Sequence, residues 1–205
     1  GPINIWKDHS DIMTVRDAGW IQLFAADHQE TANLHILAYK LAEKLRIPVM
    51  VNVDGYILTH SYEPVVIPPS SAIKKYLPDY KPKSDEYLNP ADPQTFGAFF
   101  GPAYYQATRA DLQNDLRGAL KIIKQETTAL NKILGETGIK TGGGSLIDNG
   151  LVEYCGPKNP TTIIVALGSV TGTIKEALKT EPKAGCLKIK VYRPFPGEEI
   201  AKIIG

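Results

Sequence analysis

Apolar positions near the start of the chain predict a strand, a helix and a second strand. Residues 20–25, WIQLFA, form a short apolar run. Five apolar residues then recur at the three- and four-residue spacing of one helix face: Leu34, Leu37, Ala38, Leu41 and Leu45. Asp27 and Glu30 precede that face with capping-box spacing. The run IPVMVNV from Ile47 is continuous and β-branched, as in strands buried on both faces. Strand, helix and strand with short joins predict a parallel α/β unit.

Prolines interrupt every periodicity over residues 63–105. Because this segment is also rich in aromatic and aliphatic residues, we expect it to lie extended along a surface and to connect two domains. The apolar spacing over about 107–134 predicts one long amphipathic helix that Gly135 and Gly138 should end. Glycines at 142–144 then predict a flexible join.

The last part of the chain returns to the α/β pattern. TTIIVALG from Thr161 predicts a buried strand, and SVTGTIKEAL predicts a turn and helix with Thr173 and Glu176 in capping-box spacing. CLKIKVYRPF predicts a second strand, and PGEEIAKIIG a helix that begins at Pro196. Each half has too few strands to cover a parallel sheet on both faces, so both look incomplete.

Composition narrows the classes of partner. The 205 residues carry 23 basic and 22 acidic side chains, a net charge of +1, so no nucleic-acid track or anionic membrane surface is indicated. No apolar run approaches the roughly 20 residues of a membrane span and no signal peptide opens the chain, which predicts a cytoplasmic location. Cys155 and Cys186 lack CxxC spacing, so no disulfide framework or cysteine-ligated metal is expected. The opening Gly1-Pro2 is either native or the remnant of a tag.

Charged side chains crowd the stretch IWKDHSDIMTVRDAGW: Asp8, His9, Asp11, Arg16 and Asp17. By themselves they favour a solvated turn in which Ser10 caps a short helix and Asp11 stabilises its positive end. Direct chemistry by His9 is less favoured than hydrogen bonding.

Two turns that follow predicted strands are weaker candidates. Asp54-Gly55 follows the run PVMVNV. Ligands bind at the carboxyl ends of strands in parallel sheets, but a plain turn explains this dipeptide equally well. GSVTGT from Gly168 suggests an anion site, yet it matches neither phosphate-binding fingerprint. His28 and His35 have no partner at metal-ligand spacing, so we expect them to face solvent and we expect no metal site.

Four blocks in order resemble one known family: PINIWKDHSDIMTVRDAGWIQLFA, PVMVNVDGYILTHSYEPV, TFGAFFGPAYY and TIIVALGSVTGTIKEAL with LKIKVYRPFP. They resemble the alpha subunit of pyruvate:ferredoxin oxidoreductases, the pyruvate synthases. The resemblance implies an α/β chain in three parts. These are the C-terminal part of a thiamine diphosphate pyrimidine-binding parallel-sheet domain (1–65), a proline-rich strap with a long helix (66–145), and the N-terminal part of a transketolase C-terminal-like α/β domain (146–205).

The resemblance also implies a reaction and its partners. Pyruvate, coenzyme A and oxidised ferredoxin would give acetyl-CoA, carbon dioxide and reduced ferredoxin, reversibly, with thiamine diphosphate performing the difficult chemistry. Thiamine diphosphate with magnesium would be shared with a partner chain. Iron–sulfur clusters would lie in other subunits or segments, and beta, gamma and delta type subunits would complete the complex. Nucleic acid and membrane are not expected partners.

The family places three of its cofactor- and substrate-contacting residues upstream of the segments that this chain resembles. The pyrimidine-contacting glutamate, the substrate-facing threonine and the substrate-binding arginine map to no position here, so we expect no catalytic residue in this chain and no activity from it alone. Eight residues are expected to lie near cofactor or substrate: Asn4, Asp8, His9, Asp11, Arg16, Asp17, Asp54 and Gly55. Two alternatives stay open, a non-catalytic assembly piece and a separate nucleotide or anion binder at 168–172.

Overall fold

The computed structural model describes residues 4–97, 99–139 and 145–205. Gly1-Pro2 and the predicted join at 142–144 lie outside these ranges. The helices are α1 (Ser10–Thr14), α2 (His28–Leu45), α3 (Gly55–Thr59), α4 (Ser70–Tyr76), α5 (Pro102–Glu136), α6 (Val170–Ala177) and α7 (Gly197–Ile204), with a 3₁₀ turn at Leu178–Thr180. The strands are β1 (Ile21–Phe24), β2 (Val49–Asn52), β3 (Ile147–Asp148), β4 (Val152–Cys155), β5 (Thr162–Ala166), β6 (Ala184–Ile189) and β7 (Val191–Arg193). The predicted α/β class is confirmed.

The first sheet has the order β2-β1-β7. β1 and β2 run parallel, with Ile21 opposite Val49, as predicted for strands joined by a helix. β7 pairs antiparallel on the other side of β1. The expectation that residues 47–53 form a strand buried on both faces is wrong, because β2 lies at the edge of the described sheet and is mostly half-buried.

The second sheet has the order β3-β4-β6-β5. β5 and β6 are parallel neighbours joined through α6, whereas β4 runs antiparallel to β6. The expectation of a buried strand from Thr161 is wrong: β5 is an edge strand, with Ile164 and Val165 42% and 45% exposed. β3 and β4 were not predicted, because Glu153 interrupts the apolar run of the buried strand β4.

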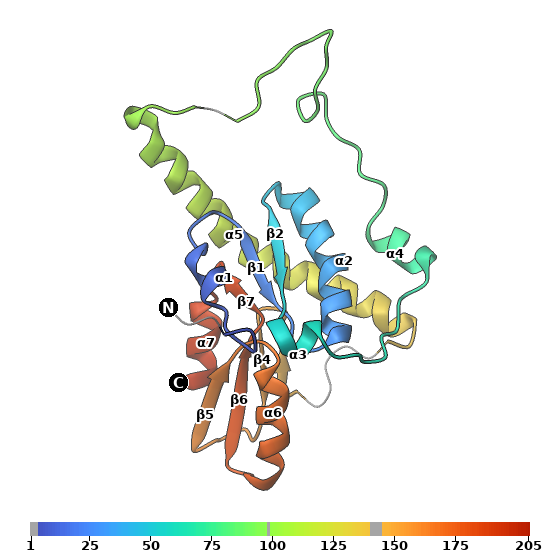
Figure 1. Ribbon diagram of the computed structural model, residues 1–205, viewed down its shortest axis with the longest axis vertical. Helices are drawn as coiled ribbons and strands as arrows, with labels where there is room; N and C mark the ends of the chain where they lie inside the picture. Colours follow the sequence, from blue (N-terminus) through green and yellow to red (C-terminus); the bar gives the residue numbers. More distant parts are fainter. Residues whose placement is uncertain (1–3, 98, 140–144) are drawn as a thin grey trace.

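The predicted strand CLKIKVYRPF is in fact two strands that belong to different sheets. They separate at Lys190, where the backbone N–H groups of Lys190 and Val191 both donate to the carbonyl of Leu151. β6 therefore lies between β4 and β5 in the second sheet, and β7 lies beside β1 in the first, as Figure 1 shows. The domain boundaries at 65 and 145 stay a prediction. Because β6 and β7 are consecutive but lie in different sheets, they connect the first and last of the three parts.

The largest core lies between the first sheet and the two long helices. Leu37 and Leu41 of α2 pack in one cluster with Leu116, Ile123 and Leu134 of α5 and with the buried β1. This confirms the apolar faces predicted for both helices. α5 begins earlier than predicted, with Pro102 as its first residue, where a missing N–H costs nothing. Gly135 lies inside the helix, and the end is followed by Gly138 in a left-handed conformation (φ +79°).

The proline-rich segment holds one short helix and then leaves the body of the molecule. α4 contacts α5, and the buried Tyr76 hydroxyl donates to the carbonyl of Glu126 at 3.2 Å. Beyond α4 the chain projects outward before it returns to α5 (Figure 1). Leu88 and Phe99 are 78% and 105% exposed. The expectation that the whole segment lies along a surface is therefore wrong for the residues around Leu88 and Phe99, whereas Glu86 still pairs with Arg46 at the end of α2.

Candidate functional site

Three separated parts of the sequence meet at one buried carboxylate. Asp54, which follows β2, is 1% exposed. Its Oδ1 lies 2.8 Å from Nε2 of His9 in the opening loop, and its Oδ2 accepts the backbone N–H of Ser169 at 2.7 Å. Asp54 thus connects the opening loop to the turn before α6. Sequence reasoning found Asp54 and His9 separately, but their contact depends on the tertiary fold.

The opening loop is shaped by its own short-range hydrogen bonds. Asp8 accepts the backbone N–H of Ser10 at 2.9 Å and the Ser10 hydroxyl at 2.8 Å, and these bonds lower the pKa of Asp8. Ser10 does not cap α1, because it is itself the first residue of the helix, and the N-cap residue His9 makes no side-chain capping bond. The loop contacts α3 through a hydrogen bond in which the backbone N–H of Tyr56 donates to the carbonyl oxygen of Ile5 at 2.7 Å. A Cβ at Gly55 would lie 2.5 Å from the same Ile5 oxygen, so glycine is required there.

The glycine turn before α6 packs directly against this carboxylate. Gly168 has φ +74°, and a Cβ there would lie 2.5 Å from Asp54 Oδ1 and 3.0 Å from His9 Nε2. The turn thus closes over the Asp54–His9 pair. The predicted capping box at Thr173 and Glu176 is wrong, because α6 already begins at Val170 and places Thr173 inside the helix.

The electrostatics of the pair favour a charged Asp54. Burial by itself would raise the pKa of Asp54, but the hydrogen bonds from His9 and Ser169 hold it below its ordinary value. The His9 ring meets Phe24 edge-on, with ring centroids 5.1 Å apart, which fixes its orientation. The buried hydroxyl of Ser169 finds no hydrogen-bond partner among the described residues.

A cavity of about 440 Å³ opens beside the pair. Five of the eight residues predicted to lie near cofactor or substrate line it: Asn4, Asp8, His9, Asp11 and Gly55. Val51, Asn52, Tyr56, Thr59 and His60 are among the other lining residues. The cavity offers carboxylates, amides and imidazoles, and its described lining contains neither lysine nor arginine.

Arg16 and Asp17 lie apart from this cavity. Their side chains pair with each other at 3.6 Å and are more than half exposed. Their backbone carbonyls accept from distant side chains, Arg16 from Arg193 Nε at 2.9 Å and Asp17 from Arg109 Nη2 at 2.7 Å. These two residues therefore fasten the loop to β7 and α5, while their place near a cofactor stays a prediction.

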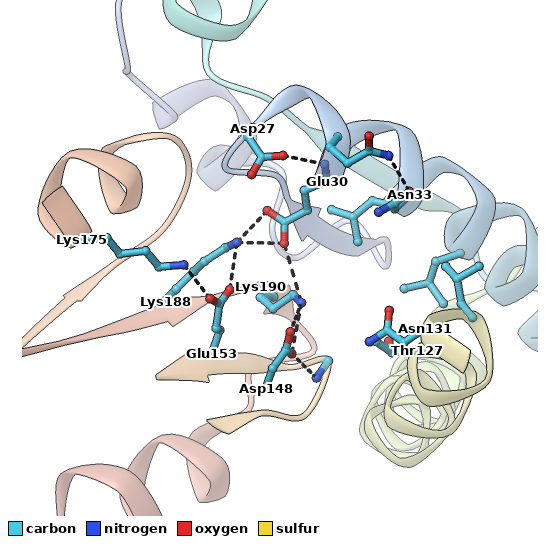
Figure 2. Close-up of a pocket in the computed structure, with 15 residues that line it drawn as sticks. Asp27, Glu30, Asn33, Thr127, Asn131, Asp148, Glu153, Lys175, Lys188 and Lys190 are labelled. Carbon is cyan, nitrogen blue, oxygen red and sulfur yellow. Dashed lines mark hydrogen bonds and ion pairs between the residues drawn. The ribbon is translucent and has the colours of Figure 1, made fainter. Parts of the chain in front are cut away.

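A second polar cluster, between α2 and the second sheet, escaped sequence reasoning. Lys188 of β6 is 3% exposed, and its Nζ lies 2.7 Å from Glu30 Oε2 and 3.3 Å from Glu153 Oε2 (Figure 2). Its neighbours extend the cluster: Lys175 to Glu153 at 2.5 Å and Lys190 to Asp148 at 3.0 Å. Its sequence signal was the presence of polar residues in apolar strand segments: Glu153 in β4, Lys188 in β6 and Lys190 between β6 and β7.

Glu30 has two roles in this cluster. The predicted cap of α2 is confirmed, because Asp27 accepts the backbone N–H of Glu30 at 2.7 Å. In a full capping box Glu30 would return to the N–H of Asp27, but its carboxylate accepts from Ala26 and Lys188 instead. The N-terminus of α2 is thereby held against β6. A cavity of about 220 Å³ lies beside these paired charges.

The charges in the cluster stabilise one another despite burial. Burial would raise the pKa of Glu153, yet Lys188, Lys175 and Ser145 lower it to about 2. Burial would lower the pKa of Lys188, but Glu30 and Glu153 raise it. Each member therefore depends on the others remaining charged.

The cluster predicts a specific acid sensitivity. The folded-state pKa of Glu153 lies below its unfolded value, so its stabilisation is present above about pH 4.3 and is lost as the pH falls toward about 2. In Glu153→Gln this stabilisation is absent at every pH. Urea unfolding of both proteins from pH 7 to pH 3 should show the stability difference shrinking on acidification. A constant difference would contradict the prediction.

Neither cluster carries a complete set of cofactor ligands. Within 4–97, 99–139 and 145–205, no group of three or more His, Cys, Asp or Glu residues is placed to hold a metal ion. The described lining beside His9 offers carboxylate, amide and imidazole groups, but it has no lysine or arginine to pair with a diphosphate. No helix in the described parts of the chain is long and apolar enough to cross a membrane.

Two family models match separate stretches of the chain. The family model described as pyruvate flavodoxin/ferredoxin oxidoreductase, thiamine diphosphate-binding, matches residues 1–128. The model for core domain II of pyruvate:ferredoxin oxidoreductase matches residues 161–205.

Curated relatives match almost the whole chain. The chain is 42% identical to the pyruvate synthase subunit PorA of Methanocaldococcus jannaschii over 99% of its own length and 51% of the relative. It is 38% identical to PorA of Pyrococcus furiosus over 98% of its length and 50% of the relative. With the ketoisovalerate oxidoreductase subunit VorA of Pyrococcus horikoshii the identity is 32%, over 98% and 50%. The chain thus spans about half the length of these relatives, and it belongs to the pyruvate flavodoxin/ferredoxin oxidoreductase family through its thiamine diphosphate-binding domain.

Proposed function

We propose that this chain is part of a thiamine-dependent pyruvate:ferredoxin oxidoreductase. The enzyme converts pyruvate, coenzyme A and oxidised ferredoxin to acetyl-CoA, carbon dioxide and reduced ferredoxin, reversibly. The observation that carries this proposal is similarity to pyruvate synthase subunits along 98–99% of the chain. Pyruvate is favoured over a branched 2-oxoacid because identity is 42% to a pyruvate synthase subunit and 32% to a ketoisovalerate oxidoreductase subunit.

The chain's part in that enzyme is to shape one side of the cofactor site. Asp54 orients His9, and Asn4, Asp8, His9, Asp11 and Gly55 lie around one cavity. Arg16, Asp17 and Asp54 hold the loop in place behind it. Bound thiamine diphosphate supplies the electron sink for decarboxylation. The chain's own residues position the loop and present polar groups to the cofactor's edge.

The rest of the site lies on other chains or segments in this proposal. The cavity's described lining contains no lysine or arginine, so the diphosphate and its magnesium need ligands from a partner. Beta, gamma and delta type subunits would provide those ligands, the iron–sulfur clusters and the ferredoxin surface. A cytoplasmic location belongs to the same proposal.

Titration of thiamine diphosphate with magnesium tests this proposal. We expect no heat of binding with this chain alone and saturable binding when a beta subunit of the same family is present, because the site forms between chains. Binding by this chain alone would show that its own residues hold the diphosphate. Absence of binding in both cases, with the complex formed, would favour a non-catalytic assembly role.

A further inference from the structure

We propose that Cys155 and Cys186 form a reversible disulfide when the chain meets a peroxide, which makes this strand pair a redox modification site. Cys155 ends β4, and the antiparallel register places it directly opposite Cys186 of β6. Opposite residues in antiparallel strands have Cα atoms about 4.5–5.5 Å apart. Disulfides form at Cα separations of about 4.4–6.8 Å, so the backbone spacing suits a bridge.

Both thiols lie on the same face of the sheet. By the same register Glu153 lies opposite Lys188, and their side chains meet at 3.3 Å. Residues two apart on a strand point to the same face. Cys155 and Cys186 therefore share the face of Glu153 and Lys188, to which Lys175 of α6 also reaches.

The two backbones approach closely beside the cysteines. A Cβ built at Gly156, the residue after Cys155, would lie 2.6 Å from Cα of Gly185, the residue before Cys186. Glycine at both positions lets β4 and β6 come together there. The Cβ separation of a disulfide, about 3.5–4.5 Å, is then reachable with a small local shift.

Solvent access differs between the two thiols and sets the order of reaction. Cys155 is half-buried and lines a cavity of about 310 Å³ with Gly156, Lys175 and Lys179, whereas Cys186 is 0% exposed. A small peroxide therefore reaches Cys155 first. Cys186 acts as the resolving thiol, because it lies directly opposite Cys155 in the strand register.

The chemistry balances with the peroxide as the oxidant. The Cys155 thiolate attacks a peroxide oxygen, so that an S–O bond forms, the O–O bond breaks and hydroxide leaves. The Cys186 sulfur then attacks the sulfenic sulfur, the S–S bond forms, the S–O bond breaks, and water leaves with the thiol proton. Both thiols are oxidised and the peroxide is reduced to water. Burial raises the pKa of the Cys186 thiol, so this second step should accelerate as the pH rises above neutral.

Hydrogen peroxide treatment of the chain, followed by intact-mass measurement and peptide mapping, tests the proposal. We expect the loss of two hydrogens, a cross-linked peptide containing Cys155 and Cys186, and reversal by dithiothreitol. The observed rate constant for bridging should not depend on protein concentration, since the bridge is intramolecular. Treatment in denaturing urea should slow bridging, because the strand register is lost.

Two variants sharpen the result. In Cys186→Ala the reaction should stop at a sulfenic acid on Cys155, which dimedone traps, whereas in Cys155→Ala the buried Cys186 should stay unmodified. The proposal is overturned if dimedone labels the wild-type Cys155 as fully as in Cys186→Ala and no cross-linked peptide appears. The wild-type peptide map decides the matter even where a variant folds poorly. The disulfide proposal and its test are also independent of the proposed enzymatic function.

Discussion

Replacing Lys188 by alanine is expected to lower the free energy of unfolding by about 3–5 kcal/mol, the range for breaking a buried ion pair from one side. Lys188 is 3% exposed, and its Nζ pairs with both Glu30 and Glu153, at 2.7 and 3.3 Å. Its removal leaves two carboxylates between α2 and the second sheet with less compensation. Urea unfolding at neutral pH measures the loss.

Two controls separate charge from packing in this experiment. Lys188→Met keeps the aliphatic stem and should lose nearly as much stability as alanine if charge dominates. Adding Glu30→Gln and Glu153→Gln to Lys188→Met removes the uncompensated charges and should recover most of the loss.

Lys179→Met serves as the exposed match, because the Lys179–Glu176 pair is about 70% exposed on both sides. This substitution should change the free energy of unfolding by less than about 0.5 kcal/mol. A similar loss in Lys179→Met would show that the effect is not specific to burial.

Replacing Asp54 by alanine is expected to be the second largest change. It leaves the buried N–H of Ser169 without its acceptor and His9 without its carboxylate. An unsatisfied buried group costs about 1–3 kcal/mol, so we expect a stability loss of that size. We also expect faster amide hydrogen exchange over residues 4–17, because the opening loop loses its anchor. Urea unfolding and hydrogen-exchange mass spectrometry measure the two effects.

The conservative variant identifies which contact matters. Asp54→Asn retains an oxygen that can accept from Ser169 but loses the charge that pairs with His9. Exchange near Ser169 should therefore stay slow in Asp54→Asn, while exchange in the opening loop rises. Asp111→Ala, on the exposed face of α5, provides the matched control and should leave both regions unchanged. Unchanged exchange in the opening loop of Asp54→Ala would contradict the anchoring role.

Local patterns in the sequence determined the two long helices, α2 and α5, and the parallel strand pair of β1 and β2. The spacing of Leu37 and Leu41 predicted the buried face of α2, and Asp27 predicted its start, because these signals depend on helical geometry alone. The parallel pairing of β1 and β2 followed from their connection by a helix. Four ordered blocks of sequence also indicated the family, which the comparisons bear out.

Only the tertiary structure decided which strands are covered and which side chains meet. β2 and β5 read as buried strands but lie at sheet edges, because strand order is set by pairings across the whole chain. The contacts of Asp54 with His9 and Ser169, and of Lys188 with Glu30, join distant parts of the sequence. The Asp54–Ser169 and Lys188–Glu30 pairs are 115 and 158 positions apart. No local periodicity encodes these contacts. The contacts of Asp54 with Ser169 and of Lys188 with Glu30 join the two halves of the fold, which β6 and β7 connect where they separate at Lys190.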